Sequence, residues 1–210
     1  MRVLLATTNR GKMSELRGIL AAEGIEVMSL GKLASSEEIE TAATFVENAL
    51  LKARHYHRLR GLPTIADDSG LEVEALAGAP GIYSARFGGL GASDTDRIAI
   101  LLDAMKNLPR ERRQARFVCA AAIVWEGGER VFLGEAQGVI LTQACGANGF
   151  GYDPVFYYEA LGKTFAELSS SEKAEVSHRG RAFRRLAAWL KESGALDTAR
   201  SSDKIESSTD

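Results

Sequence analysis

The chain has 210 residues, of which 45% are apolar and 26% are charged, and its formal net charge is -2. This length suffices for one well-buried domain, the composition is ordinary for a soluble globular protein, and the charge excludes the basic footprint of a duplex nucleic-acid binder. No apolar run reaches the length of a membrane span and the first residues lack a secretory signal, so we expect a cytoplasmic protein that binds neither membranes nor nucleic acid.

The N-terminal segment predicts a strand, a polar loop and a helix. Val3 to Leu5 is a short apolar run, and apolar residues recur at helical spacing from Met13 onward. Gly11 and Lys12 lie where the helix begins, and the unpaired backbone N–H groups of a helix start can bind phosphate. The loop differs from a Walker A loop because Ala6 replaces its first glycine. A phosphate cradle and a simple capped helix start are therefore both open.

A second strand and a second helix follow. Residues 25–28 predict a strand, and the acidic segment 35–41 predicts a surface loop. Thr44 and Glu47 form a helix-start signature, in which each side chain caps a backbone N–H group of the other. Gly61 ends this helix before the next strand.

Two adjacent acids follow the next predicted strand. Residues 64–66 predict a brief buried strand, after which Asp67, Asp68 and Gly70 predict a turn. Neighbouring carboxylates repel each other unless a divalent cation is bound or one acid stays protonated for acid/base chemistry. A solvated turn is the alternative. Lys52 would approach these acids if its helix leads back into this strand.

The middle of the chain predicts a third helix and an antiparallel hairpin. Ser93 begins a helix that Pro109 stops. Residues 117–125 are almost wholly apolar, as expected for a central strand covered on both faces. A glycine turn joins them to residues 130–136, so at least part of the sheet is antiparallel.

The last part of the chain predicts an irregular loop, a helix and a tail. Residues 146–156 predict a glycine-rich loop that carries Phe150 and Tyr152, and these aromatics either plug a core or stack on a planar ring. A final amphipathic helix starts near Lys173. We expect a single domain over residues 1–196 and a polar, disordered tail over residues 197–210.

Five blocks of this sequence resemble one known family. The order and spacing of these blocks resemble those of the inosine/xanthosine triphosphate pyrophosphatase family. The blocks are ATTNRGKMSE, TFVENALLKA, ADDSGLEVEALAGAPGIYSARF, NGFGYDPVF and EKAEVSHRGRA. The resemblance implies a Mg²⁺-dependent hydrolase that converts ITP, dITP and XTP to the monophosphate and pyrophosphate, which prevents their incorporation into DNA and RNA. It also implies an elongated two-lobed α/β fold around a central mixed β-sheet, with an active-site cleft between the lobes, and a homodimer.

The resemblance also implies roles for individual residues. By matching position, Asp68 is the base that activates water, and Glu40 and Asp68 are Mg²⁺ ligands, with Asp67 beside them. Attack on an α-phosphorus needs neutralisation of the pyrophosphate leaving group, and Mg²⁺ prefers such hard oxygen ligands. The implied substrate-binding residues are Thr7, Thr8, Asn9, Arg10, Gly11, Lys12, Lys52, Ser69, Phe150, Gly151, Tyr152, Asp153, Lys173, His178 and Arg179.

Hydrogen-bond geometry predicts how the base is chosen. Hypoxanthine and xanthine present an acceptor at O6 and a donor at N1, whereas adenine presents the opposite pair. Arg179 directed at O6, with Asp153 accepting from the ring or anchoring that cation, would favour the oxo-purine. Phe150 is the candidate for stacking on the purine, and Ser177 and His178 for lining the site.

Three alternatives stay open. They are a related pyrophosphatase for modified pyrimidine nucleotides, a phosphatase with an aspartyl nucleophile, and a nucleotide sensor that binds without cleaving. The acids Glu40, Asp67 and Asp68 argue against the sensor, because a pure sensor has no need of a metal-bound base.

Overall fold

A computed structural model of the chain describes residues 1–31, 40–89 and 91–196. Within these residues, seven strands form one mixed sheet in the order β2-β1-β3-β4-β5-β6-β7. β1 pairs in parallel with β2 and β3, and each later pairing is antiparallel. The strands are β1 (Arg2–Leu5), β2 (Glu26–Ser29), β3 (Thr64–Val73), β4 (Gln114–Trp125), β5 (Gly128–Ile140), β6 (Phe156–Tyr158) and β7 (Lys163–Thr164).

Five α-helices and several 3-10 turns accompany the sheet within the described residues. The α-helices are α1 (Arg10–Ala22), α2 (Phe45–Arg60), α3 (Asp94–Ala104), α4 (Ser170–Val176) and α5 (His178–Ser193). The 3-10 turns are η2 (Glu74–Leu76), η3 (Gly81–Arg86), η4 (Arg110–Arg112), η5 (Glu159–Leu161) and η6 (Phe165–Glu167). The predicted α/β fold with a mixed sheet is confirmed. The predicted tail lies outside the described residues, as does most of the predicted acidic loop.

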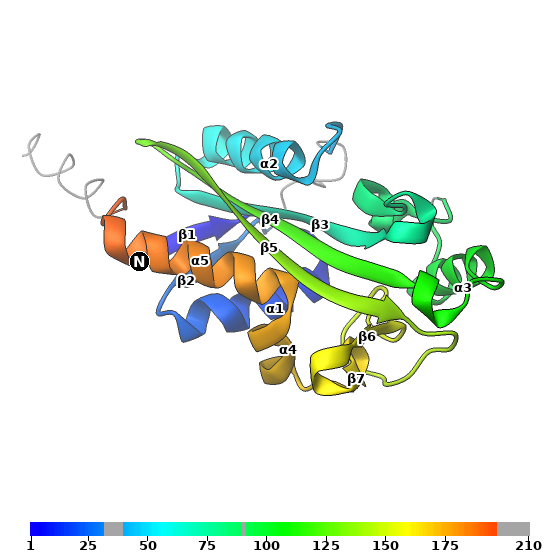
Figure 1. Cartoon of the computed structure of the whole chain (residues 1–210). Helices are drawn as coiled ribbons and strands as arrows, with labels where there is room; N and C mark the ends of the chain where they lie inside the picture. The colour runs from blue at the N-terminus through cyan, green and yellow to red at the C-terminus, as the bar shows by residue number, and fades with distance from the viewer. Residues whose placement is uncertain (32–39, 90, 197–210) are drawn as a thin grey trace, which may run out of the picture.

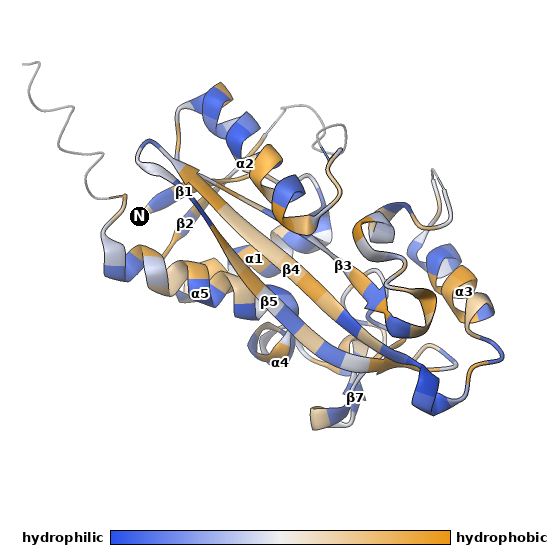
Figure 2. Ribbon diagram, turned by 45° about the horizontal axis from the view of Figure 1, so that its top comes forward, coloured by the Kyte–Doolittle hydropathy of each residue, from blue (hydrophilic) through white to orange (hydrophobic). Residues whose placement is uncertain are grey.

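The molecule is elongated, because the β4–β5 hairpin runs along most of its length (Figure 1). β1, β2, α1, α2 and α5 gather toward one end of this ribbon, and α3, β6 and β7 lie at the other (Figure 1). The colouring in Figure 2 shows the middle of β4 as hydrophobic, in agreement with its nearly continuous burial. None of the helices in the described part of the chain is long and apolar enough to cross a membrane.

Helices cover both faces of the sheet, and the alternation of β3 decides which residue meets which helix. Successive side chains of a strand point to opposite faces. Ile65 belongs to the core under α1 and α5, whereas Ala66 belongs to the core under α2. Asp67 and Asp68 continue the same alternation, so one acid points toward α1 and α5 and the other toward α2.

The helix starts follow the signals in the sequence. Thr44 caps α2 by accepting a hydrogen bond from the N–H of Glu47 at 3.1 Å, and Gly61 ends the helix in the left-handed conformation with φ of 64°. Ser93 and Asp96 form a reciprocal capping box at the start of α3. The predicted starts of these two helices are confirmed.

The predicted single helix from Lys173 is in fact two helices. Ser177 interrupts it, and its hydroxyl caps α5 by accepting from the N–H of Gly180 at 3.1 Å. A side chain at Gly180 would overlap the carbonyl oxygen of Ala174, so this glycine lets the end of α4 pack directly against α5. The interruption directs the first turn of α5 at the middle of β3, where Arg179 contacts Asp67 and Ser69.

The predicted turn at residues 67–70 is wrong. These residues lie inside β3, where each one pairs with β4. Gly70 is required for another reason, because a Cβ there would lie 2.5 Å from Ser84 Oγ in η3 and would overlap the carbonyl oxygen of Gly81. The composition is typical of a turn, but the long apolar strand β4 supplies pairing partners that override it.

Candidate active site

The candidate site forms where β1 ends and β3 continues. β1 pairs with β3 only at Leu4 with Thr64 and at Leu5 with Ile65. Beyond this point, the edge of β3 that β1 covered faces the loop leading into α1. The acids of β3 therefore lie beside the N-terminus of α1.

The start of α1 has the geometry of a phosphate site. Asn9 is its N-cap, and the side-chain oxygen accepts from the N–H of Lys12 at 3.0 Å. The N–H of Asn9 in turn donates to the buried Thr7 hydroxyl at 3.3 Å. Thr8, Asn9 and Arg10 are exposed, so a ligand can approach the positive end of the helix. The capped helix start is confirmed, and the phosphate cradle stays a prediction.

Asp67 is an anion held between two cations. It is fully buried, and its Oδ2 atom lies 3.0 Å from Lys12 Nζ and 3.5 Å from Arg179 Nε. The Ser69 hydroxyl donates to the same oxygen at 3.1 Å. Burial alone would raise the pKa of Asp67, but Lys12 and Arg179 outweigh it and hold the pKa well below the usual range. Asp67 is adjacent to Asp68 in β3, but its side chain points to the opposite face of the sheet.

Asp68 points toward α2 and lies close to Glu40. Its Oδ2 atom accepts from Asn48 Nδ2 at 3.0 Å, and its Oδ1 atom accepts from the N–H of Ser69 at 3.0 Å. Burial raises the pKa of Asp68, the positive charges of Lys52 and Lys12 oppose this rise, and the negative charge of Glu40 adds to it. Repulsion between two ionised acids at this corner is what a bound cation would relieve.

Lys52 lies one turn after Asn48 in α2 and contacts the same region. Its ammonium group donates to Glu40 Oε1 and to the backbone carbonyl of Asp67. Burial lowers the pKa of Lys52, but Asp67 and Glu40 more than compensate, so the pKa lies above its usual value. Lys52 is therefore a buried permanent cation beside the acids.

The donor set at Asp68 and Glu40 fits Mg²⁺. Within the described part of the chain, no three side chains of His, Cys, Asp or Glu form a complete metal cage. Mg²⁺ is usually bound by one or two carboxylates together with substrate phosphates and water, so two adjacent acids meet its requirement. A site of this kind would be completed by the substrate.

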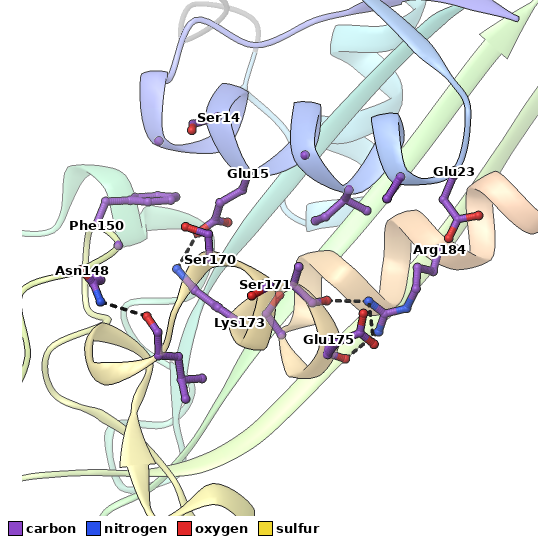
Figure 3. Close-up of a pocket in the computed structure, with 18 residues that line it drawn as sticks. Ser14, Glu15, Glu23, Asn148, Phe150, Ser170, Ser171, Lys173, Glu175 and Arg184 are labelled. Carbon is purple, nitrogen blue, oxygen red and sulfur yellow. Dashed lines mark hydrogen bonds and ion pairs between the residues drawn. The ribbon is translucent and has the colours of Figure 1, made fainter.

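Glu15, which the sequence reasoning did not single out, joins two buried cations. Its Oε1 atom accepts from Lys173 Nζ at 2.6 Å, and its Oε2 atom accepts from Arg179 Nη1 at 2.6 Å. Figure 3 shows Glu15 reaching down from α1 toward Lys173. Charges of Arg179 and Lys173 overcome the effect of burial and lower the pKa of Glu15. The available signal was its place one helical turn after Lys12.

Asp153 anchors Lys173 and not Arg179. The carboxylate accepts from Lys173 Nζ, and burial of this acid outweighs the lysine charge so that its pKa is raised. Arg179 instead contacts Glu15 and donates to the Ser69 hydroxyl at 2.9 Å. The predicted anchoring of Arg179 by Asp153 is therefore wrong.

The Phe150 ring lies against the start of α1. A Cβ at Gly11 would lie 2.5 Å from Phe150 Cδ1, so only glycine allows this approach. Lys173 Nζ and Arg179 Cζ each lie 5.1 Å from the ring centroid. The Phe150 ring therefore lies close to two cations and to the first turn of α1. Figure 3 shows Phe150 beside this turn.

The loop that carries Phe150 is held by one internal hydrogen bond and by contacts with two other elements. Its N–H donates to Asp153 Oδ2 at 2.9 Å, and the N–H of Gly151 donates to Asp94 Oδ2 at the start of α3 at 2.6 Å. The buried Tyr152 donates its hydroxyl hydrogen to the carbonyl of Ser84 at 3.0 Å. The Tyr152 side chain therefore anchors the loop to η3.

His178 is a buried, neutral imidazole. Its ring stacks on Phe117 with centroids 4.6 Å apart, and both ring nitrogens lack hydrogen-bond partners within the described residues. Burial and then the charge of Arg179 push its pKa far below the usual value. Unpaired buried polar atoms are rare in folded proteins and are typical of a site that awaits a ligand.

A cavity of about 540 Å³ adjoins these residues, bounded by α1, α4, α5 and the glycine-rich loop. Gly11, Glu15, Phe150, Lys173 and Ser177 line its inner part, and it extends along α1 past Gly18 (Figure 3). The acids of β3 do not line it. The site thus has two neighbouring parts, an acidic corner and a mostly apolar cavity.

Comparison with known proteins identifies the family. The sequence model of the Ham1 family matches residues 3–189. This chain belongs to the Ham1 family. It is 49% identical over 194 residues to the dITP/XTP pyrophosphatase of Yersinia pseudotuberculosis serotype I, covering 91% of this chain and 98% of that protein. The resemblance inferred from the five sequence blocks is confirmed.

Solved structures agree with this assignment. The Ham1 protein of Staphylococcus aureus superposes with a TM-score of 0.80 at 39% identity, covering 92% of this chain and 100% of that one. The nucleoside-triphosphatase, dITP/XTP pyrophosphatase, of Mycobacterium abscessus gives a TM-score of 0.70 at 45% identity, covering 89% of this chain and 98% of that one.

In this Ham1-family chain, most of the predicted site residues lie in or beside the two parts. Thr7, Thr8, Asn9, Arg10 and Lys12 lie in the loop and first turn of α1. The acidic corner holds Lys52, Glu40 and Asp68. The cavity side holds Gly11, Ser69, Phe150, Asp153, Lys173, His178 and Arg179. Gly151 and Tyr152 bind other parts of the protein through the contacts given above.

Proposed function

We propose that this chain hydrolyses non-standard purine nucleoside triphosphates, namely ITP, dITP and XTP, to the monophosphate and pyrophosphate. The observation that carries this proposal is the placement of Asp68 and Glu40 beside Lys52 and the N-terminus of α1. The relatives from Yersinia and Mycobacterium bear the name dITP/XTP pyrophosphatase. Removal of these nucleotides would prevent their incorporation into DNA and RNA.

The triphosphate would lie along the acidic corner. Backbone N–H groups of Arg10 and Gly11 lie in the first turn of α1, and Lys12 and Lys52 supply point charges on either side of β3. Each charge-assisted contact with a phosphate would contribute about 1.5 to 3 kcal/mol. This arrangement orients the α-phosphorus toward Asp68.

Asp68 would remove a proton from the attacking water. Its pKa is raised by burial and by Glu40, which brings a carboxylate closer to the range in which a general base is effective. The new bond joins the water oxygen to the α-phosphorus, and the bond from that phosphorus to the pyrophosphate oxygen breaks. Asp68 and Glu40 would hold Mg²⁺, which when bound neutralises charge on the leaving pyrophosphate.

The purine would enter the cavity. Phe150 offers an aromatic face, and Arg179 offers a donor that suits O6 of an oxo-purine but not the amino group of adenine. Ser177 lines the same space, and the next residue, His178, has two unpaired ring nitrogens within the described residues. Selectivity then follows because adenine would leave buried groups without partners.

Product analysis tests the proposal. In water enriched in ¹⁸O, ITP, dITP and XTP should each yield pyrophosphate and a labelled monophosphate, and EDTA should stop the reaction until Mg²⁺ is added. Release of phosphate would favour an aspartyl phosphatase, and faster turnover of dUTP or methylated UTP would favour a pyrimidine pyrophosphatase. Binding of ITP without any cleavage would favour a sensor.

We also propose a cytoplasmic homodimer, in line with the family resemblance. Light scattering during size-exclusion chromatography should give the mass of two chains. A single-chain mass at micromolar concentration would contradict the dimer and leave the proposed reaction unaffected.

A further inference from the structure

Asn48 of α2 has a completely buried side chain that connects the two proposed metal ligands. Its Nδ2 atom donates to Asp68 Oδ2 at 3.0 Å. Its Oδ1 atom accepts from the backbone N–H of Ala42 at 2.9 Å, two residues after Glu40. One amide therefore spans the gap between β3 and the segment that carries the second acid.

The two contacts fix which way the amide faces. An amide oxygen can only accept and an amide nitrogen can only donate, so the bond from the Ala42 N–H places the nitrogen toward Asp68. Asp68 Oδ2 must then act as an acceptor, while Oδ1 accepts from the N–H of Ser69. The carboxylate is held by a donor on each oxygen and keeps one orientation.

The neighbouring turn of α2 completes the arrangement. Lys52 lies four residues after Asn48, on the same side of the helix, and it contacts Glu40 itself. Asn48 acts on the backbone near Glu40 and Lys52 acts on its carboxylate. α2 thus fixes both the position of Glu40 and the orientation of Asp68.

We propose that Asn48 is a positioning residue, which aligns the Asp68 carboxylate and ties it to the Glu40 segment so that both acids are presented together to a divalent cation. This inference rests on the proposed function. It assigns Asn48 no contact with the substrate or the reacting atoms. Carboxylates that ligate metals are themselves usually held by hydrogen bonds, and loss of such a partner typically weakens metal binding by about 10- to 100-fold.

The test variant is Asn48→Leu, which has a similar volume and removes both hydrogen bonds. We expect the dissociation constant of Mn²⁺, measured by electron paramagnetic resonance on the enzyme without nucleotide, to rise by about 10- to 100-fold. In turnover of ITP, we expect a lower kcat and a higher Mg²⁺ concentration for half-maximal rate. Asn48→Ala is the second variant, because it adds no bulk if leucine disturbs folding.

The matched control is Thr44→Ala at the start of the same helix. Thr44 caps α2 and contacts Glu47, so its loss should destabilise the helix by about 1 kcal/mol without touching Asp68 or Ala42. We expect this variant to lower the melting temperature and to keep the Mn²⁺ dissociation constant of the parent. A purely structural role for Asn48 predicts that its variants behave like this control, and that result would overturn the inference.

A double variant separates the inference from the proposed function. If Asn48 acts in part through Asp68, then Asn48→Leu should weaken Mn²⁺ binding less once Asp68→Asn is present, because only its contact with the Ala42 segment is then left to lose. Additive losses would overturn the inference. Absence of pyrophosphate release by the parent enzyme would overturn the proposed function, whereas the Mn²⁺ cycle would still report on Asn48.

Discussion

Gly11 in α1 and Phe150 in the glycine-rich loop lie in direct contact, with Phe150 Cδ1 only 2.5 Å from the position of a Cβ at residue 11. The contact places an aromatic ring at the mouth of the cavity, beside the start of the helix proposed to bind phosphate. It links a residue that would touch the triphosphate to one that would touch the base.

Gly11→Ala should therefore displace the Phe150 ring and weaken substrate binding. We expect a rise in KM for ITP of about 10-fold or more, since base stacking on an aromatic ring contributes about 1 to 3 kcal/mol. Phe150→Leu should give a similar rise. Steady-state kinetics with both variants measures the effect.

Gly18→Ala provides the comparison within the same helix. A Cβ at Gly18 meets no atom within 4 Å, so this change should stabilise α1 by about 0.5 to 1 kcal/mol. If Gly11→Ala shows the same gain in stability and an unaltered KM, then the ring does not hold the position assigned to it.

Asp68→Asn should chiefly lose activity and Asp67→Asn should chiefly lose stability, although the two residues are adjacent. Asp68→Asn removes the proposed base, so turnover of ITP should fall by about 10² to 10⁴. Its amide nitrogen would face a donor, either Asn48 Nδ2 or the N–H of Ser69, so the unfolding free energy should fall by about 1 to 3 kcal/mol. Urea denaturation and product release, measured on the same samples, check both halves of this expectation. Near-normal turnover would remove Asp68 from the mechanism.

Asp67→Asn should chiefly destabilise the fold. Asp67 is the buried counter-ion of Lys12 and Arg179, and removing one partner of a buried ion pair typically costs about 3 to 5 kcal/mol. The melting temperature should drop clearly. If Asp67→Asn is as stable as the parent, the two cations do not depend on this carboxylate.

Local signals in the sequence predicted much of the fold. The cap at Thr44, the cap at Ser93 and the glycine turn between β4 and β5 each involve residues within a few positions of one another. The turn predicted around Gly70 was wrong because pairing with β4, about 50 residues away, decides the conformation there. A turn-like composition carries no information about a distant partner strand.

The site was predictable to the extent that its residues lie in recognisable blocks. Glu15 escaped notice because its partners Lys173 and Arg179 are 158 and 164 residues away in sequence. The opposite orientations of Asp67 and Asp68 followed only once β3 was known to be a continuous strand. The ion pairs of Glu15 depend on the packing of α1 against α4 and α5, which no local pattern specifies.

Arg179→Ala should narrow the preference for ITP over ATP. Loss of one charge-assisted hydrogen bond to O6 should lower kcat/KM for ITP by about 10- to 100-fold and should change kcat/KM for ATP little. Arg179 is a buried partner of Asp67 and Glu15, so the variant should lose some stability, but it should still fold because Glu15 keeps its ion pair with Lys173 and Asp67 keeps its ion pair with Lys12. Competition kinetics with the two nucleotides measures the ratio.

Arg185→Ala is the control for loss of a positive charge from α5. Arg185 is exposed and donates to the carbonyl of Leu133, away from the cavity. Its removal should leave the ITP-to-ATP ratio unaltered. An unaltered ratio for Arg179→Ala as well would mean that another group recognises O6.

His178→Phe should make the protein less sensitive to mild acid. The native pKa of His178 lies far below the unfolded value of about 6.5, so below that pH the unfolded chain binds a proton that the native protein does not. Stability of the parent is therefore lost as pH falls, by about 1.4 kcal/mol per pH unit from this group alone. A phenylalanine keeps the stack on Phe117 and has no proton to bind. Urea denaturation at pH 7.5, 6.5 and 5.5 should show similar stabilities at the highest pH and a growing advantage of the variant toward the lowest, whereas parallel curves would mean that His178 is protonated in the native protein.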